Sequence, residues 1–228
     1  GSGFSRWRGL ALTRWREDAT RDFWGSYIYL RDTQSGETWS AGFQPCGVEA
    51  AAYHASFSAD RAEIARRDRW LRTRLEVVVS PEDDTELRRL TLVNRGLTTR
   101  EIEVTSYAEL VLAPLAADVA HPAFSKLFVV TEFVPGVEAL LATRRRRGDE
   151  EPEVWLAQVA LVEAGAAVGG LQVETDRARF LGRGRDARCP LALAGAQPLS
   201  GTTGAVLDPV FSLRRRLRLP PGASARVV

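Results

Sequence analysis

Aromatic and charged side chains are concentrated in one stretch of the chain, residues 5–32. This stretch holds three Trp, two Tyr, six Arg and four acidic residues. Aromatic rings stack on the apolar faces of flat polar molecules, and guanidinium and carboxylate groups make directed, charge-assisted hydrogen bonds. The mixture therefore predicts a surface suited to sugars or nucleic acids. Its aromatic platform would be formed by Trp7, Trp15, Trp24, Tyr27 and Tyr29.

The same aromatic residues could instead form the hydrophobic face of two strands. Alternation along a strand places Tyr27 and Tyr29 on one face and Ile28 and Leu30 on the other. Because large aromatic side chains dominate core burial, we expect about half of the platform to be core.

A second distinctive spot is the segment from His121 to Lys126, which Asp118 precedes. Pro122 fixes the backbone and biases His121 away from helix, so a short loop leading into a strand is expected. His121, Ser125 and the single lysine would project from that loop. One reading is a ligand-facing loop that donates hydrogen bonds, and the other is a buried histidine satisfied by a backbone carbonyl.

Acidic residues could suggest hydrolysis by an acid–base pair, but their neighbours argue otherwise. Glu17 and Asp18 or Asp22 are interspersed with arginines. An arginine stabilises the charged form of a nearby carboxylate, which makes a poor general acid, so structural ion pairing is expected. No complete catalytic or nucleotide-binding motif is present in the sequence. His54 and His121 cannot supply a typical metal-ligand set alone.

Composition limits the class of protein. The 228 residues are 45% apolar and carry a net charge of +2, which permits a sizeable core and does not favour general polyanion binding. Arginine supplies all but one, Lys126, of the 31 basic residues. Cys46 and Cys189 give no disulfide framework and are expected to be buried thiols in a reducing compartment. Neither a secretory signal nor a membrane-spanning apolar run is present.

Short strands with closely spaced turns dominate the pattern. Residues 71–80, 86–94 and 100–112 alternate in polarity and are separated by turn clusters, which predicts an antiparallel meander. Further strands are expected at residues 126–134 and 211–219. Residues 154–163 and 171–175 flank the linker 164–170 and are expected to form a hairpin. One short helical pattern is present at residues 60–69. The fold class is therefore all-β, a large antiparallel β-sandwich over residues 1–228.

Two stretches are expected to be exposed loops. Four Arg followed by four acidic residues within residues 144–153 predict a solvated, partly self-paired loop rather than a polyanion site. Residues 187–204 are rich in Ala, Gly and Pro and predict a loop that crosses the surface.

Several long motifs resemble one protein family. The opening pattern GFSRWRG (residues 3–9) is followed by LTRWRED (12–18) and WGSYIYLRD (24–32). Further matches are WSAG (39–42), RRLTLVN (88–94), EVTSYAE (103–109) and AHPAFS (120–125). Together they resemble the cyclic β-1,2-glucan synthase family, in the first part of its phosphorylase module. That module is family 94 of the glycoside hydrolases, formerly glycosyltransferase family 36.

The resemblance implies a fold, an activity and partners. The module opens with a galactose-mutarotase-like β-sandwich, or supersandwich, and an (α/α)6 barrel follows that carries the general-acid aspartate. The module resembles inverting phosphorylases that use inorganic phosphate, so no other cofactor is expected. The chain would be a fragment of a larger protein on the cytoplasmic side of the bacterial inner membrane. Implied partners are β-1,2-linked glucan, the barrel and a second copy in a homodimer, with neither nucleic acid nor membrane contacted by this soluble fragment.

Because the barrel is absent from this sequence, the resemblance carries over no catalytic residue. It implies instead that the chain helps to shape the glucan site and the domain or dimer interface. The implied sugar-binding residues are Arg6, Trp7, Arg14, Trp15, Arg16, Trp24, His121 and Ser125. Two alternatives stay open, an autonomous carbohydrate-binding module and a pure assembly domain.

Overall fold

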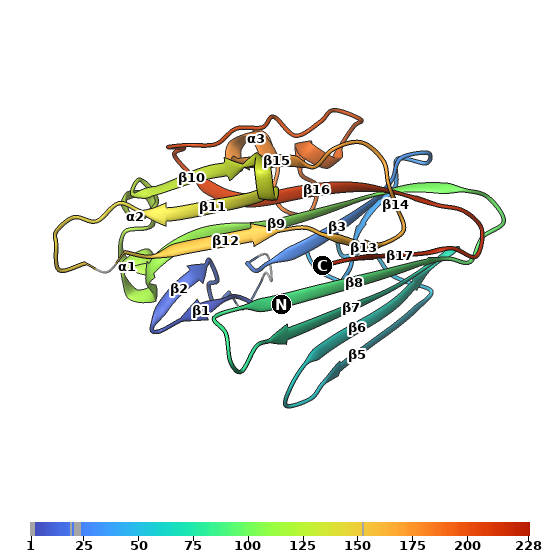
Figure 1. The fold of residues 1–228 in the computed structure, drawn as a ribbon, viewed down its shortest axis with the longest axis horizontal. Helices are drawn as coiled ribbons and strands as arrows, with labels where there is room; N and C mark the ends of the chain where they lie inside the picture. Colours follow the sequence, from blue (N-terminus) through green and yellow to red (C-terminus); the bar gives the residue numbers. More distant parts are fainter. Residues whose placement is uncertain (1–2, 19, 21–23, 152) are drawn as a thin grey trace. The chain divides into compact units, whose positions relative to one another are not determined.

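The chain divides into two compact units. A computed structural model describes residues 3–18, 20, 24–151 and 153–228 (Figure 1). Unit one comprises Gly1–Ser26, Ser106–Val159 and Leu171–Arg214, and unit two comprises Tyr27–Thr105, Ala160–Gly170 and Arg215–Val228. Antiparallel strands dominate both units, as expected for an all-β fold.

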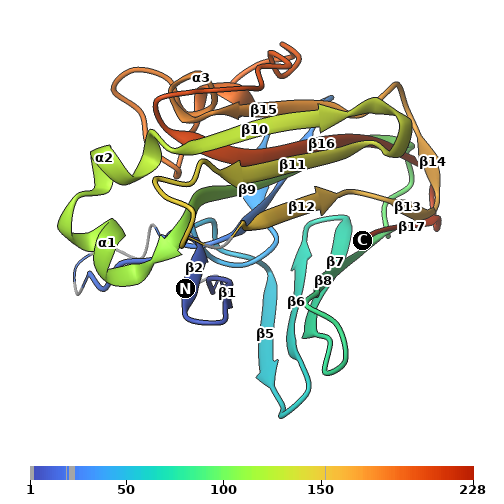
Figure 2. The same cartoon turned by 60° about the vertical axis from the view of Figure 1, so that its left-hand side comes forward.

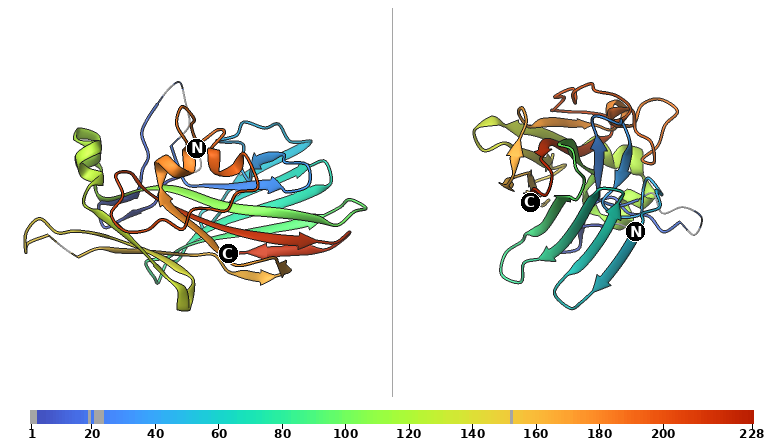
Figure 3. Two further views of the ribbon diagram at one scale, coloured as in Figure 1. Left: turned by 90° about the horizontal axis from the view of Figure 1, so that it is seen from above. Right: turned by 90° about the vertical axis from the view of Figure 1, so that its right-hand side faces the viewer.

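Alternating polarity builds the largest sheet of unit two. In β7 (Leu71–Val79), Leu71, Thr73 and Leu75 are buried, and the residues between them are exposed. β7 pairs with β8 (Glu86–Asn94) across the predicted turn. The sheet order is β13-β17-β8-β7-β6-β5, and Figure 3 shows β5 to β8 running side by side. The other strands are β5 (Ala52–Phe57), β6 (Ala62–Asp68), β13 (Val162–Ala164) and β17 (Ser224–Val227).

The core of unit two joins this sheet to a second layer. Leu75, Leu90 and Leu92 cluster with Leu30 of β3 (Tyr27–Asp32) and Trp39 of β4 (Thr38–Ser40). Residues 100–105 of β9 (Arg100–Pro114) and 215–219 of β16 (Pro209–Leu219) complete the cluster, and β14 (Ala166–Ala167) pairs with β16. Because one apolar core separates two antiparallel sheets, the β-sandwich prediction is confirmed.

Unit one contains two sheets and three short helices. In the first sheet β1 (Arg6–Trp7) pairs with β2 (Leu10–Thr13), β2 with β9, β9 with β16, and β16 with β15 (Gln172–Asp176). The second sheet is β10 (Val129–Val134), β11 (Ala139–Arg144) and β12 (Trp155–Val159). The helices are α1 (Leu115–Ala120), α2 (Pro122–Lys126) and α3 (Arg177–Leu181), with 3-10 turns η1 (Pro135–Val137) and η2 (Leu191–Leu193).

Several local predictions are wrong. The stretch 60–69 is the strand β6, held between β5 and β7, and not a helix. The expected meander of three strands does not form, because β8 pairs with β17 on its second edge. The expected hairpin around residues 164–170 is also absent, since β12 pairs with β11 and β15 pairs with β16.

The predicted exposed segments are present. Arg147 and Glu151 form an ion pair of 3.0 Å within the charged loop, so the prediction of a self-paired loop is confirmed. Residues 187–204 form a loop that contains η2 and ends at Gly204, which forms an isolated β-bridge with Thr131. No helix in the described part of the chain is long and apolar enough to cross a membrane.

Candidate functional site

All eight residues implied as sugar-binding lie in unit one. Arg6 and Trp7 form β1, and Arg14, Trp15 and Arg16 directly follow β2. The positions differ in exposure, since Arg14 and Ser125 are buried, Arg6 and His121 are exposed, and the remaining four, all in residues 7–24, are half-buried. Only part of the set can therefore contact a ligand directly.

Arg14 is held by β9 and α1 rather than by its sequence neighbours. Its backbone N–H donates to the carbonyl of Glu109 at 2.8 Å, which continues the β2–β9 pairing beyond β2. The guanidinium donates through Nη1 to Glu109 Oε2 at 2.9 Å. Through Nη2 and Nε it also donates to both oxygens of Asp118, at 2.7 and 3.0 Å. This bidentate geometry is the strongest that arginine makes with a carboxylate.

Three further charged residues complete the network around Arg14. Arg177 Nε donates to Glu109 Oε1 at 2.7 Å, and Tyr107 donates its hydroxyl hydrogen to the same oxygen at 3.0 Å. Asp208 Oδ1 lies 2.8 Å from Lys126 Nζ. We call this group the Arg14 cluster. Its three cations and three carboxylates are Arg14, Lys126, Arg177, Glu109, Asp118 and Asp208, so their formal charges balance.

The electrostatics of the cluster keep Glu109 ionised. Burial raises the pKa of Glu109, but Arg177 and Arg14 lower it by more, so the pKa lies below its ordinary value. For Arg14 the effects have the opposite sign. Burial lowers the pKa of Arg14, but the hydrogen bond with Asp118 and the charge of Glu109 raise it by more, so this pKa lies above its ordinary value. A carboxylate held in this form cannot donate a proton at neutral pH. Glu109 therefore acts as an ion-pair partner of Arg14 and Arg177 rather than as a general acid.

Aromatic rings and arginines lie beside the cluster as a second layer. Trp15 stacks on Phe4 with a centroid distance of 5.4 Å and an interplanar angle of 12°. The Arg16 guanidinium lies 5.5 Å from the Trp24 ring centroid and 3.8 Å from Asp118 Oδ2. We call Phe4, Trp15, Arg16 and Trp24 the aromatic layer. Its half-buried rings and guanidinium can stack on and hydrogen-bond to a sugar.

Ser125 lies on α2 and His121 is the single residue between α1 and α2, so the predicted loop leading into a strand is wrong. α1 and α2 meet at His121, whose N–H donates to Ala117 and whose carbonyl accepts from Ser125 (Figure 2). Pro122 occupies the first turn of α2, where a missing N–H costs nothing. Ser125 is only 4% exposed, and its Oγ has no hydrogen-bond partner. His121 alone of the two reaches solvent.

The acidic residues that partner the arginines were not identified from the sequence. Asp22 lies outside the described residues, and Asp18 accepts hydrogen bonds from Thr20. Arg14 instead pairs with Glu109 and Asp118, which lie 95 and 104 residues further along the chain. One signal was available, because a carboxylate inside an apolar strand such as β9 needs a buried partner.

Other sequence predictions concern platform aromatics and cysteines. Tyr27 and Tyr29 are fully buried and the three platform Trp residues are half-buried, which confirms that about half the platform is core. Cys189 is exposed, so the expectation of a buried thiol is wrong there. Within the described residues, no three His, Cys, Asp or Glu side chains gather as a metal site.

Comparison with known proteins extends over the whole chain. Residues 1–228 match the family described as "Glycosyl hydrolase 94, supersandwich domain". The chain is 40% identical, over its full length, to the cyclic beta-(1,2)-glucan synthase NdvB of Rhizobium meliloti, of which it covers 8%. It is 26% identical over 94% of its length to an N,N'-diacetylchitobiose phosphorylase of Vibrio proteolyticus, covering 26% of that protein. It is 25% identical over 86% of its length to a solabiose phosphorylase of Paenibacillus borealis, covering 24% of it.

The chain thus spans between 8% and 26% of the length of these relatives. The resemblance inferred from its motifs is confirmed, and the proteins similar to it in sequence include glycoside phosphorylases and a β-glucan synthase. A supersandwich is also what the strand content and antiparallel sheets of the structure indicate. The chain therefore belongs to the glycosyl hydrolase 94 supersandwich domain family.

Proposed function

We propose that this chain is the supersandwich domain of a cyclic β-1,2-glucan synthase and helps to shape the site that holds the glucan. The observation that carries the proposal is the contact between Arg16 of the aromatic layer and Asp118 of the Arg14 cluster. A paired, buried cluster holds its backbone elements rigidly, and rigid support is what a sugar-stacking surface needs. The 40% identity to a glucan synthase supports β-glucan as the ligand.

The proposal assigns no bond cleavage to this chain. Phosphorolysis with inversion needs a carboxylic acid that protonates the leaving oxygen while phosphate attacks the anomeric carbon. Glu109, Asp118 and Asp208 are each ion-paired with a cation, and the pKa of Glu109 lies below its ordinary value. We assign the general acid and the binding of inorganic phosphate to an (α/α)6 barrel in the same polypeptide. We propose no other cofactor.

The wider setting of the chain belongs to the same proposal. Residues 1–228 would act as one domain whose partners are the barrel, β-1,2-linked glucan and a second copy of the chain. The parent protein would lie at the cytoplasmic side of the bacterial inner membrane. The glucan synthase relative, of which this chain covers 8%, supports a longer parent protein and β-glucan as a partner.

Calorimetric titration with linear β-1,2-glucan oligosaccharides tests the proposal, with a β-1,4-linked oligomer as the control ligand. We expect selective binding of the β-1,2-linked chain. Trp15→Ala or Trp24→Ala should weaken it about tenfold, because each removes a stacking face. Trp155→Ala is the matched control, since Trp155 lies on β12 and is exposed.

Two results would contradict the proposal. Binding that is equal for both linkages, or that survives both tryptophan substitutions in folded protein, would remove the aromatic layer from the glucan site. Turnover of β-1,2-glucan by the chain with phosphate would show that it carries a general acid of its own. A circular dichroism spectrum of each variant checks that it is folded.

The edge of the six-stranded sheet favours a second candidate, a role in assembly alone. Every residue of β5 is exposed, including Tyr53 and Phe57, and β5 pairs only with β6 among the described strands. Open sheet edges are templates for pairing with another chain. Self-association in sedimentation without any glucan binding would favour this candidate, and a monomer that binds glucan would exclude it.

A further inference from the structure

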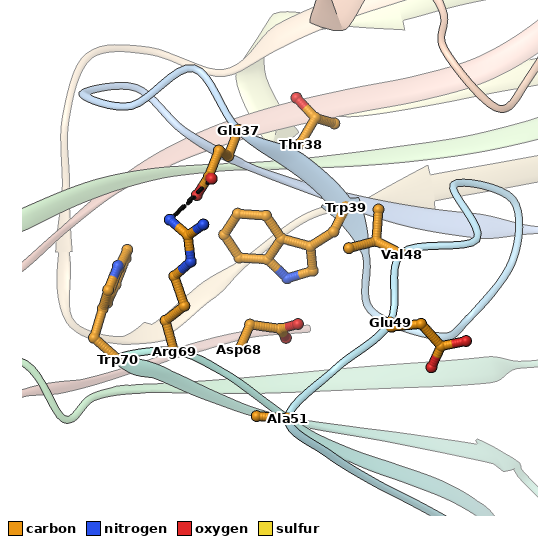
Figure 4. A pocket seen from close by; sticks show the side chains of 9 residues that line it. All are labelled: Glu37, Thr38, Trp39, Val48, Glu49, Ala51, Asp68, Arg69 and Trp70. Atoms are coloured by element: carbon orange, nitrogen blue, oxygen red, sulfur yellow. Dashed lines mark hydrogen bonds and ion pairs between the residues drawn. The ribbon is translucent and has the colours of Figure 1, made fainter.

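A pocket in unit two contains none of the residues implied as sugar-binding. Its volume is about 400 Å³, within the range of small-molecule sites. It lies where the β3–β4 connection meets the β6–β7 turn, and its chemistry comes from six side chains (Figure 4). These are Glu37, Trp39, Glu49, Asp68, Arg69 and Trp70, which we call the Trp39 pocket.

Two indole rings line the Trp39 pocket. Figure 4 shows the Trp39 ring face-on and the Trp70 ring edge-on, with the Arg69 side chain rising between them. The Arg100 guanidinium lies 4.9 Å from the Trp70 ring centroid and covers one face of that ring. Trp39 is 6% exposed, and its indole N–H has no hydrogen-bond partner. A ligand atom or a water can satisfy such a donor.

The floor of the pocket carries a carboxylate held in place from behind. Both oxygens of Asp68 accept hydrogen bonds from Arg66, at 2.7 and 2.6 Å. Arg66 is buried and also donates to the carbonyls of Ser40, Gly42 and Val48. Because the guanidinium is fixed by five hydrogen bonds, Asp68 presents its remaining lone pairs in a fixed direction.

The rim of the pocket is charged and accessible. Arg69 and Glu37 form an ion pair of 2.9 Å, and their side chains are 73% and 48% exposed. Glu49 is also exposed. Arg69 offsets Glu37 and Arg66 offsets Asp68, so the excess of negative charge at the pocket comes from Glu49 alone. That excess disfavours phosphates, nucleotides and acidic sugars.

We propose that the Trp39 pocket binds a neutral pyranose, a glucosyl unit of a β-linked glucan. Trp39 is a nearly buried core residue, so the half-buried Trp70 ring supplies the apolar surface for a pyranose ring, and fixed carboxylates accept hydrogen bonds from the sugar hydroxyl groups. The choice of glucose rests on the proposed function, whereas the preference for a neutral sugar rests on the pocket itself. The pocket adds a second sugar site, separate from the aromatic layer.

Indole N–H signals in proton–nitrogen correlation spectra of this chain test the site. The six tryptophans report on the pocket and on the aromatic layer separately. Titration with sophorose, a β-1,2-linked glucose disaccharide, should move the signals of Trp39 and Trp70 in a saturable way and leave that of Trp155 in place. Movement confined to Trp15 and Trp24 would overturn the pocket proposal and support the proposed function. No movement of Trp39 or Trp70 up to the solubility of sophorose would overturn it as well.

Variants at the rim keep the test independent of folding. Glu49→Ala should weaken sophorose binding at the pocket by about fivefold, because it removes one hydrogen-bond acceptor. Glu150→Ala, at an exposed position of the charged loop, is the matched control. Trp70→Ala should abolish the shift of Trp39, and its remaining indole signals show whether it is folded. Glucuronate that moves Trp39 and Trp70 as strongly as glucose would overturn the assignment of a neutral sugar.

Discussion

Burying a guanidinium is costly unless carboxylates accept its N–H groups, and Arg14 meets this requirement with two of them. Its side chain is 1% exposed, as is that of Asp118, and Glu109 is 8% exposed. Because these three side chains are almost inaccessible to water, each charge is stabilised by its ion-pair partners and not by solvent. Removing or reshaping one member leaves a buried charge uncompensated, which is far more damaging than losing an exposed ion pair.

Replacing Arg14 by lysine should therefore destabilise the protein although the charge is kept. An ammonium group lacks the planar fork that reaches Glu109 and both oxygens of Asp118. We expect Arg14→Lys to lower the free energy of unfolding by about 3 kcal/mol, in the range for a broken buried pair. Urea denaturation followed by circular dichroism measures the change.

Arg147→Lys provides the matched comparison. Arg147 pairs with Glu151 at 3.0 Å in the charged loop, where its side chain is 56% exposed. We expect its urea midpoint to equal that of the unmodified chain within error. Equal losses in Arg14→Lys and Arg147→Lys would refute the view that burial, rather than pairing alone, gives the Arg14 cluster its importance.

At this scale the sequence indicated residue types but not partners. The run of Arg and Trp before residue 25 predicted charge-assisted bonds, and Arg14 makes them. Its partners lie about a hundred residues away on β9 and α1, and local spacing carries no information about such pairs. Local spacing also does not predict that Trp39 of β4 and Trp70 of the β6–β7 turn line one pocket.

Among the elements, the β13–β14 connection places the strictest demand on one residue. Gly165 adopts a φ of +106°, and a Cβ built on it would lie 2.6 Å from the Cβ of Ala225 in β17. Both the left-handed backbone and the close approach require glycine. Gly169 shares a positive φ of +74° but faces open space, and Gly170 has neither constraint.

A graded series of alanine substitutions should follow these constraints. Gly165→Ala combines backbone strain with overpacking against the core, and should cost about 3 kcal/mol. Gly169→Ala should cost about 1 kcal/mol for the backbone alone, and Gly170→Ala should be close to neutral. Thermal unfolding of the three variants gives the order. A Gly165→Ala variant as stable as Gly170→Ala would contradict the close packing of this connection.

Elements whose polarity alternates were predictable, and those whose pairing is non-local were not. The strands β7 and β8 follow from alternation and from the turn between them. β15 pairs with β16, which lies well beyond the expected hairpin, and β12 pairs with β11, the preceding strand across the charged loop. The sequence does not predict α2 because Pro122 indicates a loop, whereas it occupies the first turn of α2.

For the molecule as a whole, long motifs were more informative than composition. A net charge of +2 excluded little beyond general polyanion binding, whereas the motifs spread over residues 3–125 pointed to the family that the comparison confirms. The balance of 31 basic and 29 acidic residues has a physical consequence. In both units arginines are buried against carboxylates, as with Arg14 in unit one and Arg66 in unit two. Stability should therefore depend on keeping the carboxylates ionised.

Acid should destabilise the protein, and Glu109 gives the direction. Its pKa in the folded state lies below the ordinary value of 4.5, because Arg177 and Arg14 outweigh the effect of burial. A group with a lowered folded pKa contributes its full stabilisation above the unfolded-state pKa, and loses it as the pH falls toward the folded pKa. For this one carboxyl the slope is at most about 1.4 kcal/mol per pH unit.

Urea midpoints at pH 7, 5, 4 and 3 would follow this loss, with Glu109→Gln as the comparison. At pH 7 the variant should be less stable, since Arg14 and Arg177 lose a charged partner. The stability difference should start to narrow at about pH 4, where the unfolded chain takes up a proton at Glu109, and it should vanish only below the lowered pKa of the folded state. A stability difference that stays constant from pH 7 to pH 3 would mean that Glu109 acts through its shape and hydrogen bonds rather than through its charge.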